Sequence, residues 1–156
     1  MKIQFGSGGN ILPGWVNTDL EHAVAVKDLV DITKLLPYGN EVADEILAEH
    51  VCEHITPQQL LSFLMECRRI LKPGGVLRMI CPVVGPWLPK GLAIDLTVNH
   101  GHQIVMDQHI MTTFLWMAGF EEKKIVRTAR KTIDGHFRMI GLQRDDLESC
   151  RMEATK

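Results

Sequence analysis

The sequence predicts a single α/β domain built on a mainly parallel β-sheet, with helices packed against its faces. Two observations support this prediction. Short apolar runs typical of buried strands alternate along the chain with helical patterns, and the first apolar run ends directly at glycines. The length of 156 residues and the hydrophobic content of 46% suit one core that needs no disulfide or metal.

The N-terminal third contains four candidate strands. The first two are expected at residues 1–5 and 15–20, and only residues 10–14 lie between them. This connection has room for one helical turn at most, which is unusual between parallel neighbours. A weaker strand is expected at residues 28–32 and a stronger one at residues 43–48.

A helix is expected to begin at Thr56 and Pro57, because threonine is a good N-cap and proline suits the first helical position. The apolar residues that follow recur at helical spacing and predict a core-facing stripe: Leu60, Leu64, Cys67 and Leu71. Residues 72–75 (KPGG) are expected to stop the helix. Residues 76–81 then form a buried strand.

The second half begins with residues 82–106, whose prolines and glycines predict a long irregular loop. Asp107 is a candidate cap for a helix that runs to Ala118, and Gly119 is its expected C-terminal stop.

The chain is then expected to close with an antiparallel hairpin formed by residues 124–129 and 137–142. The polar residues 144–156 are interpreted as a fraying tail, so the predicted domain spans residues 1–143.

Composition limits the partners and the compartment. A net charge of −2 gives no general attraction to nucleic acid or to an acidic membrane surface, so neither is an expected partner. The four cysteines lack CxxC spacing, and no signal-peptide pattern or membrane-length apolar run is present. The expected location is therefore the cytoplasm.

Four candidate ligand groups follow the predicted parallel strands, where open α/β sheets bind ligands. They are the glycine turn at residues 6–9, Asp19, the pair Asp31 and Ile32, and residues 49–54. Glycines allow close approach of a backbone to a ligand, and a carboxylate such as Asp19 can accept hydrogen bonds from ribose hydroxyls. Each group also has a purely structural explanation as a turn or cap.

The histidines raise the question of a metal. His50 and His54 are four residues apart, and His100, His102 and His109 are further donors. The pattern is not HExxH, however, and histidines dispersed over two segments do not define one geometry. The sequence therefore leads us to expect no metal.

In order and spacing, four stretches resemble the class I S-adenosylmethionine-dependent methyltransferases, in particular a small type 11-like branch. They read FGSGGNILPGWVNTDL, DITKLLPYGNEVADEILAEHVCEHI, ECRRILKPGGVLRMICP, and HGHQIVMD with LWMAGF. The likeness covers about residues 3–143. It implies a Rossmann-like, doubly wound, seven-stranded sheet whose last strand is antiparallel, with S-adenosylmethionine bound across the first and fourth strand ends.

The resemblance also implies roles for individual residues. The implied cofactor contacts are Gly6, Ser7 and Gly8 on the methionine moiety, Asp19 on the ribose, Leu20, Asp31 and Ile32 around the adenine, and His50 under the methionine side. Gln4 departs from the family pattern, because many class I enzymes carry an acid at that position.

The implied reaction is methyl transfer to an unidentified acceptor, expected to be a small molecule. His50, His54 and His102 are candidate general bases because histidine titrates near neutrality, although each could simply pack or cap. A non-catalytic protein that binds S-adenosylmethionine or a nucleoside is the main alternative. A nicotinamide oxidoreductase is disfavoured by the missing GxGxxG. A homodimer is a further expectation, based on the apolar content of residues 106–117.

Overall fold

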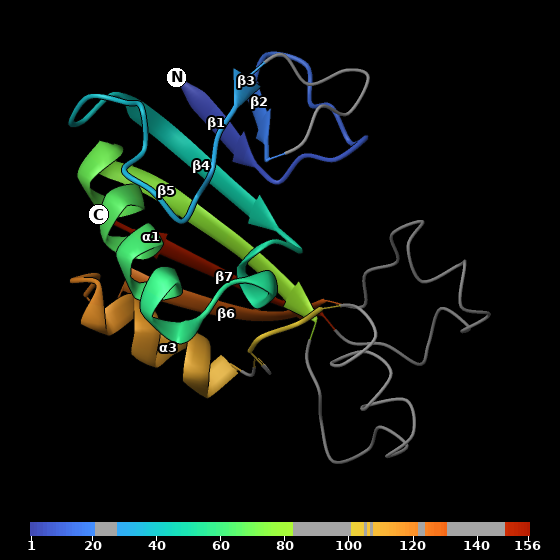
Figure 1. The fold of residues 1–156 in the computed structure, drawn as a ribbon. Helices are drawn as coiled ribbons and strands as arrows, with labels where there is room; N and C mark the ends of the chain where they lie inside the picture. Colours follow the sequence, from blue (N-terminus) through green and yellow to red (C-terminus); the bar gives the residue numbers. More distant parts are fainter. Residues whose placement is uncertain (21–27, 83–100, 105, 107, 122–123, 131–148) are drawn as a thin grey trace.

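A computed structural model describes residues 1–20, 28–82, 101–104, 106, 108–121, 124–130 and 149–156. Within these residues, seven strands form one sheet in the order β3-β2-β1-β4-β5-β7-β6 (Figure 1). The strands are β1 Lys2–Phe5, β2 Val16–Asp19, β3 Asp28–Leu29, β4 Ala43–Glu49, β5 Leu71–Pro82, β6 Ile125–Arg130 and β7 Ser149–Thr155.

The sheet is parallel except at β7. Strand β1 lies between β2 and β4, and Ile3 pairs with Val16 of β2 on one side and with Ile46 of β4 on the other. Strand β7 lies between β5 and β6 and is antiparallel to both. The predicted mainly parallel α/β sheet with an antiparallel last strand is therefore confirmed.

The closing strand corrects the prediction for the C-terminus. The partner of β6 is β7, and the expected strand at residues 137–142 lies outside the described residues. Met152 and Ala154 are fully buried, so the predicted fraying tail and the domain boundary at residue 143 are wrong. Buried and polar residues alternate in β7 with the period of two typical of a strand. The charged neighbours Arg151 and Glu153 masked this signal in the sequence.

Helix α1 spans Pro57–Ile70 and begins as predicted. The Thr56 hydroxyl accepts a hydrogen bond from the Gln59 backbone N–H, and the Gln59 side-chain oxygen accepts one from the Thr56 backbone N–H, which completes a capping box. The predicted apolar stripe is buried against the sheet. The chain leaves the helix at Leu71, which is already part of β5.

Helix α3 spans Gln108–Met117, and the predicted cap Asp107 lies outside the described residues. Its expected stop is confirmed. Gly119 has φ +94° and donates to the Trp116 carbonyl, while Phe120 donates to the Leu115 carbonyl, as in a Schellman motif. Figure 1 shows α3 beside α1 on one face of the sheet.

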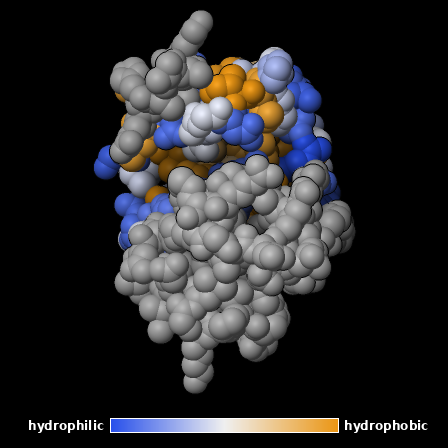
Figure 2. All heavy atoms as spheres, turned by 90° about the vertical axis from the view of Figure 1, so that its right-hand side faces the viewer, coloured by the Kyte–Doolittle hydropathy of each residue, from blue (hydrophilic) through white to orange (hydrophobic). Residues whose placement is uncertain are grey.

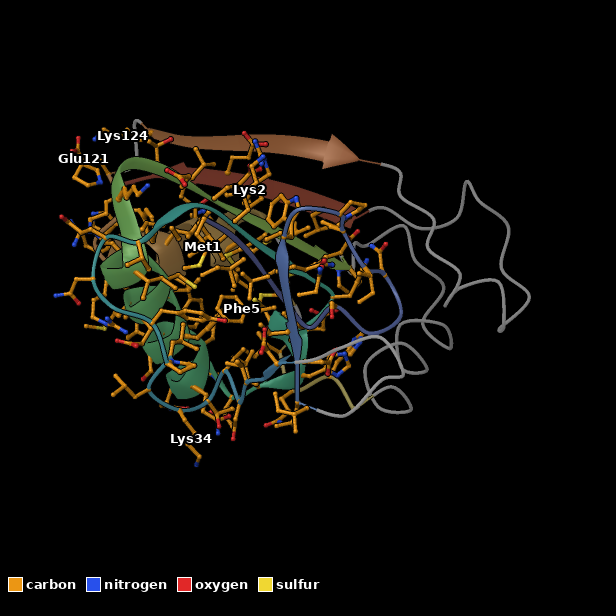
Figure 3. The ribbon with its side chains drawn as sticks, turned by 90° about the horizontal axis from the view of Figure 1, so that it is seen from above. Met1, Lys2, Phe5, Lys34, Glu121 and Lys124 are labelled. Atoms are coloured by element: carbon orange, nitrogen blue, oxygen red, sulfur yellow. The ribbon has the colours of Figure 1, made fainter. Side chains whose placement is uncertain are left out.

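The core lies between this helical layer and the sheet. Phe5 is fully buried and makes edge-to-face contacts with Phe63 of α1 and with Tyr38, at ring-centroid distances of 5.3 and 6.2 Å. Figure 3 shows Phe5 in the interior and Lys34 projecting outward. No helix in the described part of the chain combines the length and apolarity needed to cross a bilayer.

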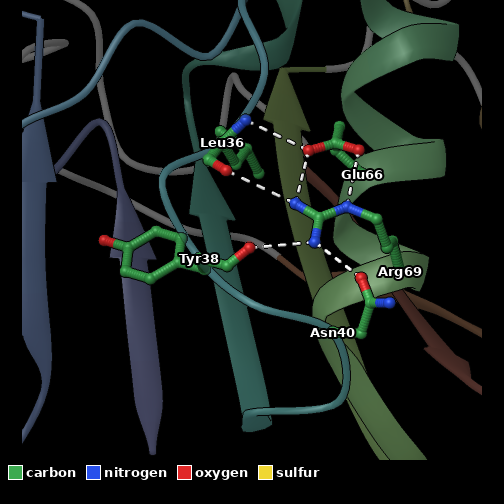
Figure 4. A network of polar contacts seen from close by, with 5 residues as sticks. All are labelled: Leu36, Tyr38, Asn40, Glu66 and Arg69. Carbon is green, nitrogen blue, oxygen red and sulfur yellow. Dashed lines mark hydrogen bonds and ion pairs between the residues drawn. The ribbon is translucent and has the colours of Figure 1, made fainter.

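One polar network fastens the loop before β4 to α1 (Figure 4). The guanidinium of Arg69 forms two hydrogen bonds with the Glu66 carboxylate, at 2.8 and 2.7 Å. Its remaining donors reach the carbonyls of Leu36 and Tyr38 and the side chain of Asn40. All five N–H donors of the guanidinium are therefore used, and the pKa of Glu66 is lowered, chiefly by its hydrogen bonds from Arg69.

Candidate functional site

The loop between β1 and β2, residues 6–15, contains turns but no helix, as the short spacing predicts. Gly6 and Gly8 both adopt left-handed backbone conformations, with φ of +65° and +51°. The Asn17 side chain holds the far side of the loop, because it accepts from the Leu12 backbone and donates to the carbonyls of Leu12 and Trp15. This loop replaces the helix that usually connects parallel neighbours.

Asp19, the last residue of β2, closes the glycine turn. One carboxylate oxygen accepts from the Gly8 N–H and the other from the Leu20 N–H, each at 2.7 Å. Ser7 N–H donates to the Thr18 carbonyl at 3.0 Å, so the turn is tied to β2. A carboxylate oxygen has two lone pairs and is able to accept more than one hydrogen bond.

A pocket of about 260 Å³ opens at this edge of the sheet. Figure 2 faces that edge and shows apolar surface beside polar side chains. The lining residues come from five chain segments: Gly6, Asp19, Leu20, Val30, Asp31, Ile32, Thr33, Val51, His54, Ile55, Gln59 and Gln103. Ligands of open parallel sheets bind beyond the carboxyl ends of the strands, where this pocket lies.

The pocket brings together six of the residues singled out in the sequence: Gly6, Asp19, Leu20, Asp31, Ile32 and His54. The other four, Ser7, Gly8, His50 and His102, do not line it. Ser7 is buried behind the turn, and Gly8 contributes through its bond to Asp19. Gln4, which stands where many class I enzymes carry an acid, is also buried and does not line the pocket.

The lining combines apolar walls with a few oriented polar groups, which is typical of small-molecule sites. Among the polar groups, Asp31 accepts from the hydroxyl and the backbone N–H of Thr33, at 2.6 and 2.9 Å. These two hydrogen bonds, the hydroxyl first, hold the pKa of Asp31 below its usual value. Asp31 therefore presents a negative charge to the pocket at neutral pH.

The sequence analysis did not single out several of the residues that line the pocket. Val30, Thr33 and Ile55 adjoin residues or segments that were singled out, so a wider window around each strand end would have included them. Gln59 lies in the first turn of α1, and Gln103 lies in the late histidine segment. Tertiary packing alone brings these two glutamines to the same pocket.

The segment after β4 turns sharply. His50 has φ +51° and continues the strand pairing by donating from its N–H to the Ile80 carbonyl at 2.8 Å. A short 3₁₀ helix at Cys52–His54 follows. The His54 ring meets the His102 ring edge-to-face with centroids 4.8 Å apart, which joins the two histidine segments. His109 is an exposed residue of α3 outside this cluster.

Residues 11–79 match a protein family described as methyltransferase domain. The matched segment contains β2, β3, β4 and α1, and so supplies most of the pocket lining. Over this segment the chain is similar to methyltransferases. No curated protein matches the chain by sequence.

Solved structures share the fold over 99% of this chain. A S-adenosylmethionine-dependent methyltransferase from Archaeoglobus fulgidus is 14% identical, with a TM-score of 0.72, and 85% of that chain is covered. One from Mesorhizobium loti is 11% identical, with a TM-score of 0.67 and 90% of that chain covered.

A larger relative is phosphoethanolamine N-methyltransferase 2 from Haemonchus contortus, solved with phosphomonomethylethanolamine and S-adenosylhomocysteine. It is 12% identical, with a TM-score of 0.67, and the present chain spans 48% of its length. At such identities, these likenesses establish the fold and leave the acceptor open.

Proposed function

We propose that this protein is a methyltransferase, which binds S-adenosylmethionine in the pocket beside Asp19 and transfers its methyl group to a small-molecule acceptor. The observation that carries the proposal is the convergence of Gly6 and Asp19 on one pocket, with apolar residues forming its walls. Asp19 would accept hydrogen bonds from the ribose hydroxyls. Leu20 and Ile32 would flank the adenine, and Asp31 would address its amino edge.

The donor and acceptor chemistry of the lining fits a nucleoside. A ribose offers two hydroxyl donors, and a carboxylate such as that of Asp19 accepts hydrogen bonds through both of its oxygens. Adenine needs apolar contact on its faces, which Leu20 and Ile32 can supply. The suggested methionine-side roles of Gly6, Ser7, Gly8 and His50 remain part of the proposal.

The bound cofactor would supply an electrophilic methyl group, so the protein's own task is orientation and exclusion of water. Positioning of this kind can lower a barrier by about 7–11 kcal/mol. Of the three candidate bases, His54 is the one that lines the pocket. His54 is therefore the histidine placed to contact a bound acceptor. His50 and His102 do not line the pocket.

Calorimetric titration with S-adenosylmethionine, S-adenosylhomocysteine and NAD tests the proposal. We expect the first two to bind and Asp19→Asn to weaken them by about 10- to 100-fold, because hydrogen bonds to a charged group contribute about 1.5–3 kcal/mol. Asp28→Asn is the matched control, since Asp28 is an exposed carboxylate on the neighbouring strand outside the pocket. Circular dichroism establishes that both variants fold.

NAD binding without S-adenosylmethionine binding would overturn the proposal, as would equal losses in the two variants. Cofactor binding with no S-adenosylhomocysteine produced from any acceptor would favour the non-catalytic binding protein. The predicted irregular loop, residues 82–106, lies mostly outside the described residues.

A cytoplasmic homodimer is part of the same proposal. Cys52 and Cys67 are buried free thiols, which suits a reducing compartment. Trp116 and Met117 at the end of α3 are 64% and 52% exposed, an apolar pair that a second copy could cover. Sedimentation of the wild type and of Trp116→Glu tests the dimer, which the substitution should dissociate.

A further inference from the structure

Three side chains with metal-binding atoms meet beside the pocket. Glu53, His54 and His102 each offer one ligand atom, and these atoms all lie within 4.8 Å of one another. Glu53 and His54 end the 3₁₀ helix after β4, whereas His102 is almost fifty residues later in the chain. The cluster therefore exists only in the folded protein.

Backbone hydrogen bonds hold the two segments together. The N–H groups of Gln103 and Ile104 both donate to the Glu53 carbonyl, at 2.7 and 3.3 Å. The Gln103 side chain donates to the His54 carbonyl at 2.8 Å. These three bonds place His102 against His54, so the cluster is supported by main-chain contacts on both sides.

The Glu53 carboxylate is the unusual member. Its side chain is 1% exposed, and Oε1 lies 3.3 Å from Nδ1 of His50. Among the described residues, its other oxygen, Oε2, has no hydrogen-bond partner. Burial of a charged oxygen without a partner is costly, and natural proteins offset it with a cation or a hydrogen bond. The orphaned oxygen thus points to a positively charged ligand.

We propose that Glu53, His54 and His102 bind a divalent first-row transition-metal ion, with Zn²⁺ the best match. Two imidazole nitrogens and one carboxylate oxygen are borderline ligands of the kind that Zn²⁺ and Fe²⁺ accept. Ligands about 2.0–2.2 Å from a tetrahedral Zn²⁺ lie about 3.3 Å apart, so modest side-chain rotations would close the site. His50 orients the carboxylate from outside the ligand set.

The position of the ion gives it a role at the pocket. Three protein ligands leave a fourth coordination position open, as in catalytic zinc sites. Because His54 also lines the pocket, a heteroatom of a bound molecule can reach that position. This role rests on the proposed methyl transfer, and the ion would then hold an oxygen or nitrogen acceptor. The metal site itself does not depend on it.

Titration of the full-length protein with Zn²⁺ alone, without any cofactor, tests the site. We expect one equivalent to bind and His102→Asn to weaken the binding by at least tenfold. His109→Asn is the matched control, since His109 is an exposed histidine outside the cluster. Co²⁺ provides a second readout, because its visible absorption should indicate nitrogen and oxygen ligands and should change in His102→Asn.

Glu53→Gln tests the buried carboxylate and should also lose at least tenfold in Zn²⁺ affinity. Should that variant fail to fold, His102→Asn still decides, because His102 is only partly buried. Absence of Zn²⁺ binding to the wild type would overturn the proposal, as would equal affinity in His102→Asn and His109→Asn. Neither result bears on S-adenosylmethionine binding, which the Asp19 titration measures separately.

Discussion

Replacement of Gly6 by alanine tests whether the glycine turn is shaped by contact with the segment after β4. Gly6 has φ +65°, and a Cβ added there would lie 2.7 Å from Cβ and 2.8 Å from Cγ2 of Val51. Gly8 has a similar φ of +51°, yet a Cβ added there would meet no atom within 4 Å. Gly8→Ala is therefore a control with the same backbone cost and no collision.

The expected magnitudes follow from this geometry. A left-handed backbone costs a non-glycine residue about 1–2 kcal/mol, and both variants bear this cost. Carbon atoms prefer separations of about 3.5–4.0 Å, so Val51 would have to shift by about 1 Å in Gly6→Ala. Overpacking of this kind costs about 1–3 kcal/mol. We expect losses of unfolding free energy of about 1–2 kcal/mol for Gly8→Ala and about 2–5 kcal/mol for Gly6→Ala.

Urea unfolding followed by circular dichroism measures both losses. Addition of Val51→Ala to Gly6→Ala should restore part of the difference, because it removes Cγ2 and leaves Cβ in place. The reasoning is refuted if the two glycine variants lose the same free energy. It is also refuted if Val51→Ala has the same effect on stability with and without Gly6→Ala.

The Arg69 network and the cap of α1 give further predictions, measured by the same unfolding assay. Arg69→Lys should lower the free energy of unfolding by about 1–3 kcal/mol, because a lysine cannot supply the five N–H donors of a guanidinium. An unchanged midpoint of urea unfolding would contradict this. The pKa of Glu66 is lowered in the folded state, so its stabilisation is present above the ordinary value of 4.5 and is lost as pH falls through the folded value. Glu66→Gln should therefore flatten the acid side of the stability profile, and an unaltered slope would argue against the pair. Thr56→Ala should lose about 1 kcal/mol through the capping box, whereas Ser62→Ala, on the exposed side of the same helix, should lose much less.

Features encoded by neighbouring residues could be predicted from the sequence. The start of α1 follows from Thr56 and Pro57, and its stripe follows from helical spacing. The strand at residues 43–48 ends in three consecutive apolar residues, Ile46, Leu47 and Ala48, all buried, as expected for a strand covered on both faces. The end of α3 follows from Gly119.

Features that depend on distant partners could not be predicted. Strand β7 was not predicted because its charged residues, Arg151 and Glu153, gave the segment the polar character of a tail. The pairing with β5 and β6 shows that it belongs to the sheet. Gln103 reaches the pocket through hydrogen bonds to Glu53 and His54, a contact that no local spacing encodes. The same contacts assemble the cluster for which the sequence led us to expect no metal.

The sequence by itself determined the α/β class, the glycine turn and the acids at the strand ends, because caps, turns and hydrophobic periodicity act between residues close in the chain. Only the tertiary structure decided that Gly6, Asp19 and Asp31 share one pocket and that His102 lies against His54. Those contacts join segments through strand pairing and buried hydrogen bonds, whose free energy depends on the packed geometry of the whole domain.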